Sequence, residues 1–105
     1  MKIGIDLGGT KTEGILIDDK GNELARNRIK TKKDYDGTIS GIISIVKKFE
    51  TEFGDSKSIG IGMPGCVSSE TALVKNANSI WLNGMPFKKD LEKKLNRRVN
   101  LQNDA

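Results

Sequence analysis

The sequence predicts an α/β protein in which helices pack on a mixed β-sheet, in the element order β-β-β-α-β-α-β. Three observations predict this class. Apolar and polar residues alternate along residues 2–8, and two further strand-like segments follow up to about residue 30, separated by turn-forming residues. Large apolar residues then recur every three or four positions over 38–53, as they do on one face of a helix. A β-branched segment, a second stripe of helical spacing and a final short strand follow in turn.

The first three strands are expected at 2–8, at about 12–18 and at about 23–30. A Gly-Gly turn separates the first from the second, and a turn rich in Asp, Gly and Asn separates the second from the third. Strands joined by such short turns pair with their chain neighbours, so we expect an antiparallel arrangement.

The first helix is expected at about 38–53. Asp36 or Thr38 can accept a hydrogen bond from the N–H groups of the first turn and so cap the start of the helix. Gly54 follows the apolar stripe and is expected to end the helix, because glycine adopts the backbone conformation of a helix C-terminus without strain.

The second half of the chain predicts a buried strand at 57–63, an irregular stretch at 66–85 with room for a short hairpin, and a strand from residue 99. Pro86 fits the start of a second helix, because the N–H that proline lacks is not needed there. The basic residues expected on the solvated face of that helix are Lys88, Lys89, Lys93, Lys94, Arg97 and Arg98.

The composition excludes several classes of protein. The chain has 105 residues, one cysteine and no histidine, so neither a disulfide framework nor a zinc site is expected within it. No apolar run reaches the roughly 18 residues of a membrane span, and Asp6 interrupts the stretch in which a signal peptide is apolar, which indicates a cytoplasmic protein. The net charge of +4 comes from basic residues scattered among acids, which gives little support for nucleic acid binding. Cys66 is expected to be a small buried residue.

The segment Gly4–Thr12 is the first candidate site. Its glycines carry no Cβ, can adopt backbone conformations closed to other residues, and let backbone N–H groups approach a phosphate. Asp6 precedes the turn and is able to hold a water of hydrated Mg²⁺. The segment differs from a Walker A loop, because Thr10 stands where the lysine belongs and a strand follows in place of a helix. A plain hairpin turn is an equally good interpretation of these residues alone.

Gly60–Gly65 satisfies the pattern G-x-G-x-x-G of dinucleotide-binding proteins. We reject that interpretation, because the pattern must open a helix and the residues after Gly65 show no helical stripe. Pro64 and Gly65 instead indicate a bend close to a ligand or to neighbouring backbone, and a purely structural turn is slightly favoured.

Two further polar segments are candidates. Asn76–Gly84 combines amides with a tryptophan, a set that suits the hydroxyls and apolar faces of sugars, although amide-rich loops without a function are commoner. Asn103 and Asp104 follow the last strand, where ligands of parallel sheets gather, and an aspartate there can accept a proton from a hydroxyl. A solvated turn acid is an equally good interpretation of Asp104 alone.

Together, these segments resemble the motifs of ROK-family sugar kinases, within the actin/hexokinase ATPase superfamily. The stretch Ile3–Lys11 is similar to the family's phosphate motif, and Gly60–Gly65, Asn76–Gly84 and 103–105 follow in the family's order and at about its spacing. The resemblance covers the whole chain and is closest to bacterial fructokinases and N-acetylglucosamine kinases.

The resemblance implies an RNase H-like lobe of the actin-like ATPase type. Residues 1–105 would be the N-terminal lobe of a two-lobed sugar kinase, with the C-terminal lobe absent from this chain. The implied reaction is ATP-dependent phosphorylation of a hexose hydroxyl, the hexose being fructose, N-acetylglucosamine, mannose or glucose. The isolated lobe is expected to be inactive, because part of both substrate sites lies beyond it.

The resemblance also implies roles for individual residues. The residues expected at the ATP phosphates are Gly4, Ile5, Asp6, Leu7, Gly8, Gly9, Thr10 and Lys11. Asp6 would also hold Mg²⁺ through water. The residues expected at sugar hydroxyls are Gly65, Asn78 and Asn103, and Asp104 would be the catalytic base.

The remaining implications concern partners. The expected partners are the sugar and ATP, with no nucleic acid and no membrane, and the full-length protein is expected to be a homodimer. The family's zinc site would lie in the absent C-terminal part. The alternative is a sugar-sensing transcriptional regulator of the same family. Such regulators carry an N-terminal helix-turn-helix domain, for which a first strand at residue 2 leaves no room, so the kinase is favoured.

Overall fold

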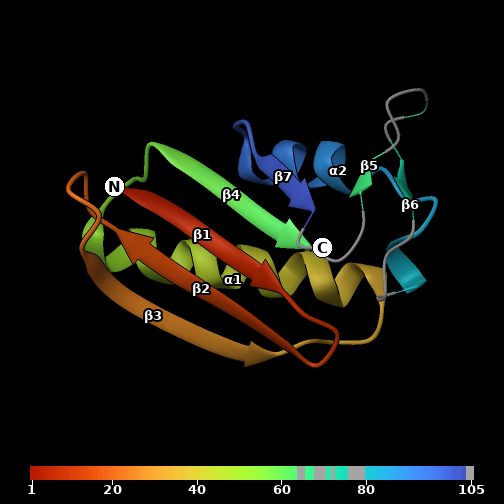
Figure 1. The fold of residues 1–105 in the computed structure, drawn as a ribbon, viewed down its shortest axis with the longest axis horizontal. Helices are drawn as coiled ribbons and strands as arrows, with labels where there is room; N and C mark the ends of the chain where they lie inside the picture. Colours follow the sequence, from red (N-terminus) through yellow and green to blue (C-terminus); the bar gives the residue numbers. More distant parts are fainter. Residues whose placement is uncertain (64–65, 68–70, 72, 76–79, 104–105) are drawn as a thin grey trace.

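A five-stranded mixed sheet forms the centre of the computed structural model, which describes residues 1–63, 66, 67, 71, 73–75 and 80–103. The strands lie in the order β3-β2-β1-β4-β7 (Figure 1). Their bounds are β1 Lys2–Leu7, β2 Lys11–Ile17, β3 Glu23–Lys30, β4 Ser58–Met63 and β7 Asn100–Asn103. β1, β2 and β3 are antiparallel neighbours, as the short turns predicted, whereas β4 and β7 run parallel to β1.

The helices α1 (Tyr35–Phe53) and α2 (Phe87–Leu95) lie on the same side of this sheet (Figure 1). The described residues also form a small antiparallel pair, β5 (Cys66–Val67) with β6 (Val74–Lys75), and a short 3-10 helix, η1 (Ile80–Leu82). These short elements fall in the stretch that was expected to be irregular with room for a hairpin. No helix in the described part of the chain is both long and apolar enough to span a bilayer.

The sequence predicted the end of α1 correctly but not the residue that caps its start. Asp34 caps the start, because its carboxylate accepts the N–H of Gly37 at 2.5 Å. The expected caps were wrong: Asp36 and Thr38 lie inside the helix, and the Thr38 hydroxyl donates back to the Asp34 carbonyl at 2.8 Å. Gly54 ends the helix as predicted, with a φ of 92° that favours glycine.

The core lies between the sheet and the two helices. The β1 residues that face the helices are at most 3% exposed: Ile3, Ile5 and Leu7. The buried apolar stripe of α1 consists of Ile39, Ile42, Ile45, Val46 and Phe49. Burial of one such side chain contributes about 1.5–3 kcal/mol to stability. The predicted alternation in β1 is therefore confirmed. The helical stripe predicted from the sequence consists of Ile39, Ile42, Ile43, Val46, Phe49 and Phe53. Four of these six are buried, Ile43 and Phe53 are only partly buried, and Ile45 is a buried residue that the prediction missed.

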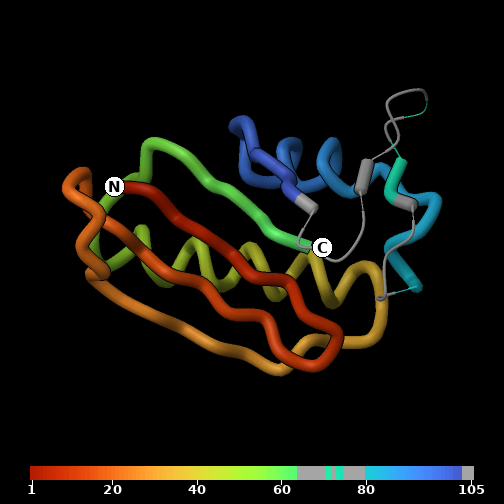
Figure 2. The backbone as a smooth tube through the Cα atoms, in the orientation of Figure 1, coloured from red at the N-terminus to blue at the C-terminus, as the bar shows by residue number. Residues whose placement is uncertain are grey.

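The start of α1 is fixed on two sides. The loop before it passes beside the turn that joins β1 and β2 (Figure 2), where the Thr31 N–H donates to the Thr10 carbonyl at 2.9 Å. Tyr35 joins α1 to α2, because its hydroxyl donates to Asp90 at 2.5 Å and its ring packs edge-to-face with that of Phe87 at a centroid distance of 6.3 Å. Burial and the hydrogen bond to Asp90 raise the pKa of Tyr35 well above its usual value.

A partly buried ion pair ties the end of α1 to the segment before β7. Arg97 donates two hydrogen bonds to the Glu50 carboxylate, one of them 2.7 Å long, and the backbone N–H of Ser56 donates to the same carboxylate at 2.8 Å. Arg97 was expected on the solvated face of α2, and that expectation was wrong. The hydrogen bonds from Arg97 hold the pKa of Glu50 below its usual 4.5, so the pair stabilises the fold above that pH and this contribution is lost as the pH falls further.

We predict that the close approach of β2 to α1 makes Gly14 intolerant of a side chain. A Cβ on Gly14 would lie 2.3 Å from Ile45 Cγ2 and 3.1 Å from Phe49 Cε2. Gly14→Ala is therefore expected to lower the free energy of unfolding by about 1–3 kcal/mol, the usual cost of overpacking. Denaturant titration of the purified variant measures this change.

The matched control is Gly60→Ala, also in a strand, where a Cβ would meet no atom within 4 Å. Both changes remove the same backbone freedom from the unfolded chain, so the difference between them isolates the packing effect. Equal stability of the two variants would contradict tight packing between β2 and α1.

Candidate active site

The turn between β1 and β2 contains two glycines with different surroundings. The Gly8 N–H donates to the Lys11 carbonyl at 3.0 Å, which closes the turn. A Cβ on Gly8 would lie 2.7 Å from that same carbonyl oxygen, whereas a Cβ on Gly9 would meet no atom within 4 Å. The special backbone conformation expected of these glycines does not occur, because the described residues with positive φ are Gly21, Gly54, Gly84 and Asn96. Gly8 is therefore required by close packing and Gly9 is not.

The turn presents backbone donors to solvent. Gly9 and Thr10 are exposed, and neither N–H donates a hydrogen bond to another described residue. Backbone N–H groups in a concave turn bind anions, and the space beside Gly9 is open. Among the described residues, the turn thus leaves the N–H groups of Gly9 and Thr10 without a hydrogen-bond acceptor.

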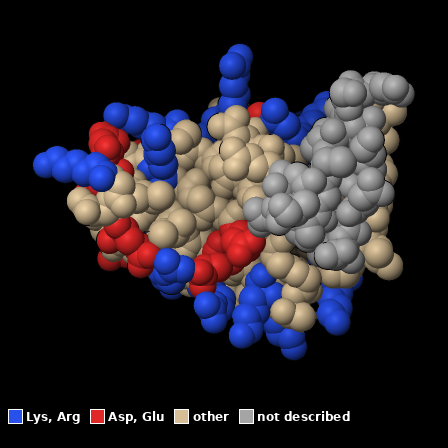
Figure 3. All heavy atoms as spheres, in the orientation of Figure 1, with Lys and Arg blue, Asp and Glu red and all other residues tan. Residues whose placement is uncertain are grey.

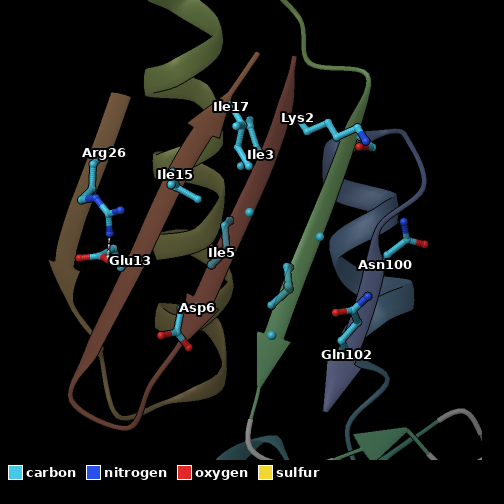
Figure 4. Close-up of a pocket in the computed structure, with 15 residues that line it drawn as sticks. Lys2, Ile3, Ile5, Asp6, Glu13, Ile15, Ile17, Arg26, Asn100 and Gln102 are labelled. Atoms are coloured by element: carbon cyan, nitrogen blue, oxygen red, sulfur yellow. Dashed lines mark hydrogen bonds and ion pairs between the residues drawn. The ribbon is translucent and has the colours of Figure 1, made fainter. Parts of the chain in front are cut away.

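The residues expected at the ATP phosphates fall into three groups. Gly8–Lys11 form the turn itself or begin β2. Gly4 and Asp6 lie on the side of β1 that faces away from the helices (Figure 4). Ile5 and Leu7 point into the core and are 3% and 1% exposed, so any contact of these two with a ligand must come from their backbone.

The sheet face opposite the helices carries a shallow hollow of about 510 Å³ (Figure 4). The hollow forms where glycines on neighbouring strands place no side chain on this face. Gly4 is paired with Gly60, and Asp6 is paired with Gly62. Asp6 is exposed at the end of β1, where the strand leads into the turn. Figure 3 shows this face with uncharged atoms over much of its middle, Asp and Glu side chains just below the middle and at the left, and Lys and Arg side chains around its edge.

Glu13 is a second carboxylate in this hollow, and cross-strand ion pairs hold it. It accepts a hydrogen bond from Arg26 (Figure 4) and another from Arg28, whose Nε lies 2.8 Å from the carboxylate. These hydrogen bonds, above all the one from Arg28, lower the pKa of Glu13. Glu13 is thus a charged group that joins β2 to β3.

The parallel strands β1, β4 and β7 end at one edge of the sheet, beside the glycine turn. Their last residues are Leu7, Met63 and Asn103, and Met63 is paired with Asn103. Ligands of sheets with parallel strands bind at this edge. Of the residues expected at the sugar and at the reacting hydroxyl, the structure describes only the backbone of Asn103. Those outside the described residues are Gly65, Asn78, Asp104 and the side chain of Asn103. The side chain of Cys66, expected to be buried, also lies outside them.

The structure bears on two other sequence interpretations, the candidate segment Asn76–Gly84 through Trp81 and the pattern at Gly60–Gly65. Trp81 is half-buried and packs against the core, and its indole N–H donates to the Thr38 hydroxyl at 2.8 Å, so this residue anchors η1 to α1. The short strand β5 follows β4 where a dinucleotide-binding pattern would open a helix. The rejection of the dinucleotide interpretation of Gly60–Gly65 is therefore confirmed.

Comparison with known families matches one family model, the ROK family, over residues 2–105. The chain belongs to the ROK family. This ROK domain is 37% identical over 106 residues to the N-acetyl-D-glucosamine kinase of Aliivibrio salmonicida (strain LFI1238). The match covers 100% of the domain and 35% of that kinase, so the domain spans about a third of the length of the relative.

Solved structures show the same fold as the ROK domain. A ROK family glucokinase from Streptomyces griseus, in complex with glucose and AMPPNP, is 31% identical with a TM-score of 0.85, over 99% of the domain and 33% of the glucokinase chain. A ROK hexokinase from Thermus thermophilus is 27% identical with a TM-score of 0.82, over 98% of the domain and 35% of the hexokinase chain. The expected actin-like ATPase fold class is confirmed.

We predict that the two glycines of the turn respond oppositely to a methyl group. Gly8→Ala is expected to lower the free energy of unfolding by about 1–3 kcal/mol, because the Cβ would displace the backbone of Lys11. Gly9→Ala is expected to leave it unchanged or slightly raised, because the space is open and the unfolded chain loses freedom. Thermal unfolding of both variants, made in the same polypeptide, checks this. A greater loss of stability in Gly9→Ala would contradict the geometry of the turn.

Proposed function

We propose that the protein containing this ROK domain transfers the γ-phosphoryl group of ATP to a hydroxyl of a hexose, with residues 1–105 as its N-terminal lobe. The observation that carries the proposal is the open glycine turn, with the exposed N–H groups of Gly9 and Thr10, at the edge where β1, β4 and β7 end. The glucokinase that shares the fold binds glucose and AMPPNP, which supports both substrate classes. The hexoses we propose are N-acetylglucosamine, glucose, fructose and mannose.

The chain's own groups would bind the phosphates of ATP at the turn. The N–H groups of Gly9 and Thr10 donate to phosphate oxygens, and Lys11 adds positive charge beside them. Asp6, exposed at the end of β1, would hold Mg²⁺ through a water molecule. Bound Mg²⁺ neutralises charge on the transferring phosphate. The described residues contain no group of three His, Cys, Asp or Glu side chains suited to a metal, and we place the family's zinc site beyond this chain.

The sugar would lie at the same edge of the sheet, against Gly65, Asn78 and Asn103. Asp104 would orient the attacking hydroxyl and take its proton. A free aspartate has a pKa of about 3.9, far below that of a hydroxyl, so the proton moves late, as the loose transition state forms. Asn103 is the last residue of β7 and would hold a neighbouring hydroxyl, which fixes the rotation of the sugar.

The complete enzyme would need more than this lobe. Phosphoryl transfer depends on holding donor and acceptor together, and we place the remaining contacts with adenosine and sugar on a C-terminal lobe. The isolated residues 1–105 would therefore be inactive. We further propose a cytoplasmic homodimer that acts on free sugar and ATP.

Steady-state kinetics of the complete protein with ATP and a panel of the four hexoses test the proposed function. Asp104→Asn keeps the shape of the side chain and removes its basic oxygen. We expect kcat to fall by about 10²–10⁴, the usual effect of losing a general base, with sugar binding largely kept. Asp55→Asn, a change of the same kind at an exposed acid, is the control. A variant that keeps more than about a tenth of wild-type kcat would show that Asp104 is only a strand-end acid.

Bulk at Gly9 tests the phosphate contact separately. Gly9→Val places side-chain atoms in the space where phosphate oxygens would lie, and its Cβ would meet no atom within 4 Å. Loss of one such charged hydrogen bond lowers affinity about 10- to 100-fold, so the KM for ATP should rise by this factor. The KM for the sugar and the melting temperature serve as internal controls. Unchanged kinetics with ATP in the folded variant would refute phosphate binding at this turn.

A further inference from the structure

We infer that Thr31 is a positioning residue for the phosphate-binding turn. Its hydroxyl and its backbone N–H hold the carbonyls of Gly8 and Thr10 inward, and the Gly9 N–H is thereby directed at the phosphate. This inference rests on the proposed function, which it extends to a residue outside the glycine motif. Thr31 follows β3 and is separated from the turn by the whole β2–β3 hairpin.

Thr31 makes two hydrogen bonds to the turn. Its N–H donates to the Thr10 carbonyl at 2.9 Å, and its hydroxyl donates to the Gly8 carbonyl at 2.9 Å. The oxygen of the Thr12 hydroxyl lies 2.7 Å from the oxygen of the Thr31 hydroxyl. Thr12 and Thr31 are only 3% and 5% exposed, so water does not compete for these groups.

The direction of each hydrogen bond follows from counting protons. A hydroxyl has one proton to donate, and a carbonyl can only accept. The Thr31 proton is therefore used toward Gly8, and the Thr12 hydroxyl must be the donor in its contact with Thr31. The result is a chain in which Thr12 donates to Thr31 and Thr31 donates to Gly8. Each bond in such a chain polarises the next and strengthens it.

The inward carbonyl of Gly8 has a direct effect on the N–H of Gly9. The two groups belong to one peptide unit, which is planar, and the described chain contains no cis peptide bond. In a trans unit the N–H points opposite to the C=O. Holding the Gly8 carbonyl toward Thr31 therefore turns the Gly9 N–H away from the protein, and this N–H donates to no other described residue. Thr31 thus orients a donor that it does not touch.

Thr31→Val in the complete protein tests the inference, because valine keeps the shape of the side chain and removes the hydroxyl. We expect the KM for ATP to rise about five- to tenfold, in line with the loss of one buried hydrogen bond, with the KM for sugar unchanged. Thr31→Ser restores the hydroxyl and should return the KM for ATP to within about twofold of wild type. Thr12→Val leaves the hydrogen bond from Thr31 to Gly8 in place and removes the hydroxyl that donates to Thr31. We therefore expect the KM for ATP to rise about two- to threefold in this variant.

The matched control is Thr38→Val. Thr38 is also 3% exposed, and its hydroxyl bonds to the carbonyls of Lys32 and Asp34 and to Trp81, none of them in the turn. This variant should lose comparable stability and keep the wild-type KM for ATP. An equal rise in the KM for ATP in Thr38→Val, or no rescue by Thr31→Ser, would overturn the inference in favour of a general structural role. If Thr31→Val does not fold, an unchanged KM for ATP in Thr12→Val overturns it.

Amide hydrogen exchange, measured without nucleotide, separates this inference from the proposed function. The Gly8 N–H is bonded to Lys11 inside the turn, so its protection reports how firmly the turn is held. We expect faster exchange at Gly8 in Thr31→Val and no change in Thr38→Val. If the wild-type protein phosphorylates no sugar, the proposed function fails while this exchange result still decides whether Thr31 holds the turn. Unchanged exchange at Gly8 in Thr31→Val would overturn the inference even in an active kinase.

Discussion

The in-register parallel pairing of β1 with β4 is the constraint on which the rest of the structure depends. It sets Ile3 beside Ile59 and Ile5 beside Ile61, so one continuous apolar surface faces α1 and α2. A slip of one residue would put the apolar side chains of one strand on the opposite face of the sheet from those of the other strand. The same register places the ends of both strands at one edge, and β7 extends that edge through its pairing with β4. Burial of the core and assembly of the candidate site are thus two results of one alignment.

The strand register also explains how one segment combines a core and a ligand role. Because side chains alternate along β1, its apolar residues face the helices, and Gly4 and Asp6 lie on the opposite face of the sheet. At the end of the strand, the turn continues this division, because Gly8 packs against backbone and Gly9 faces open space. Gly8, whose packing closes the turn, is therefore distinct from Gly9, which faces the space where a phosphate would lie.

Patterns within one segment predicted most of the fold, and contacts between distant segments account for what they missed. The alternation in β1, the stripe of α1 and the ending at Gly54 depend on neighbours in the chain, and all three were confirmed. The role of Arg97 depends on Glu50, 47 residues away, and helical spacing alone placed it in solvent. The cap of α1 was misplaced because Asp34 and Asp36 have the same chemistry, and only the path of the loop from β3 decides between them.

The same reasoning applies to the candidate site. The glycine motif identified the turn, but the sequence could not separate Gly8 from Gly9, because the difference lies in the distance to Lys11. Thr31 was missed because its bond to Gly8 spans 23 residues and no local pattern marks it. A buried threonine directly after a strand is the signal that could have drawn attention to it. The residues proposed for the sugar and the proton, Asn78 and Asp104, stay predictions.

The anchoring of Trp81 has a spectroscopic consequence. It is the sole tryptophan among the 105 residues, so all indole emission from this chain comes from the junction of η1 with α1. The ring is half-buried, and its N–H is bonded to Thr38 in the first turns of α1. Emission wavelength depends on the polarity around the indole, and breaking the bond to Thr38 would expose the ring to water. The chain therefore carries an intrinsic fluorescent reporter of whether the segment after Asn76–Ser79 is docked on its helix.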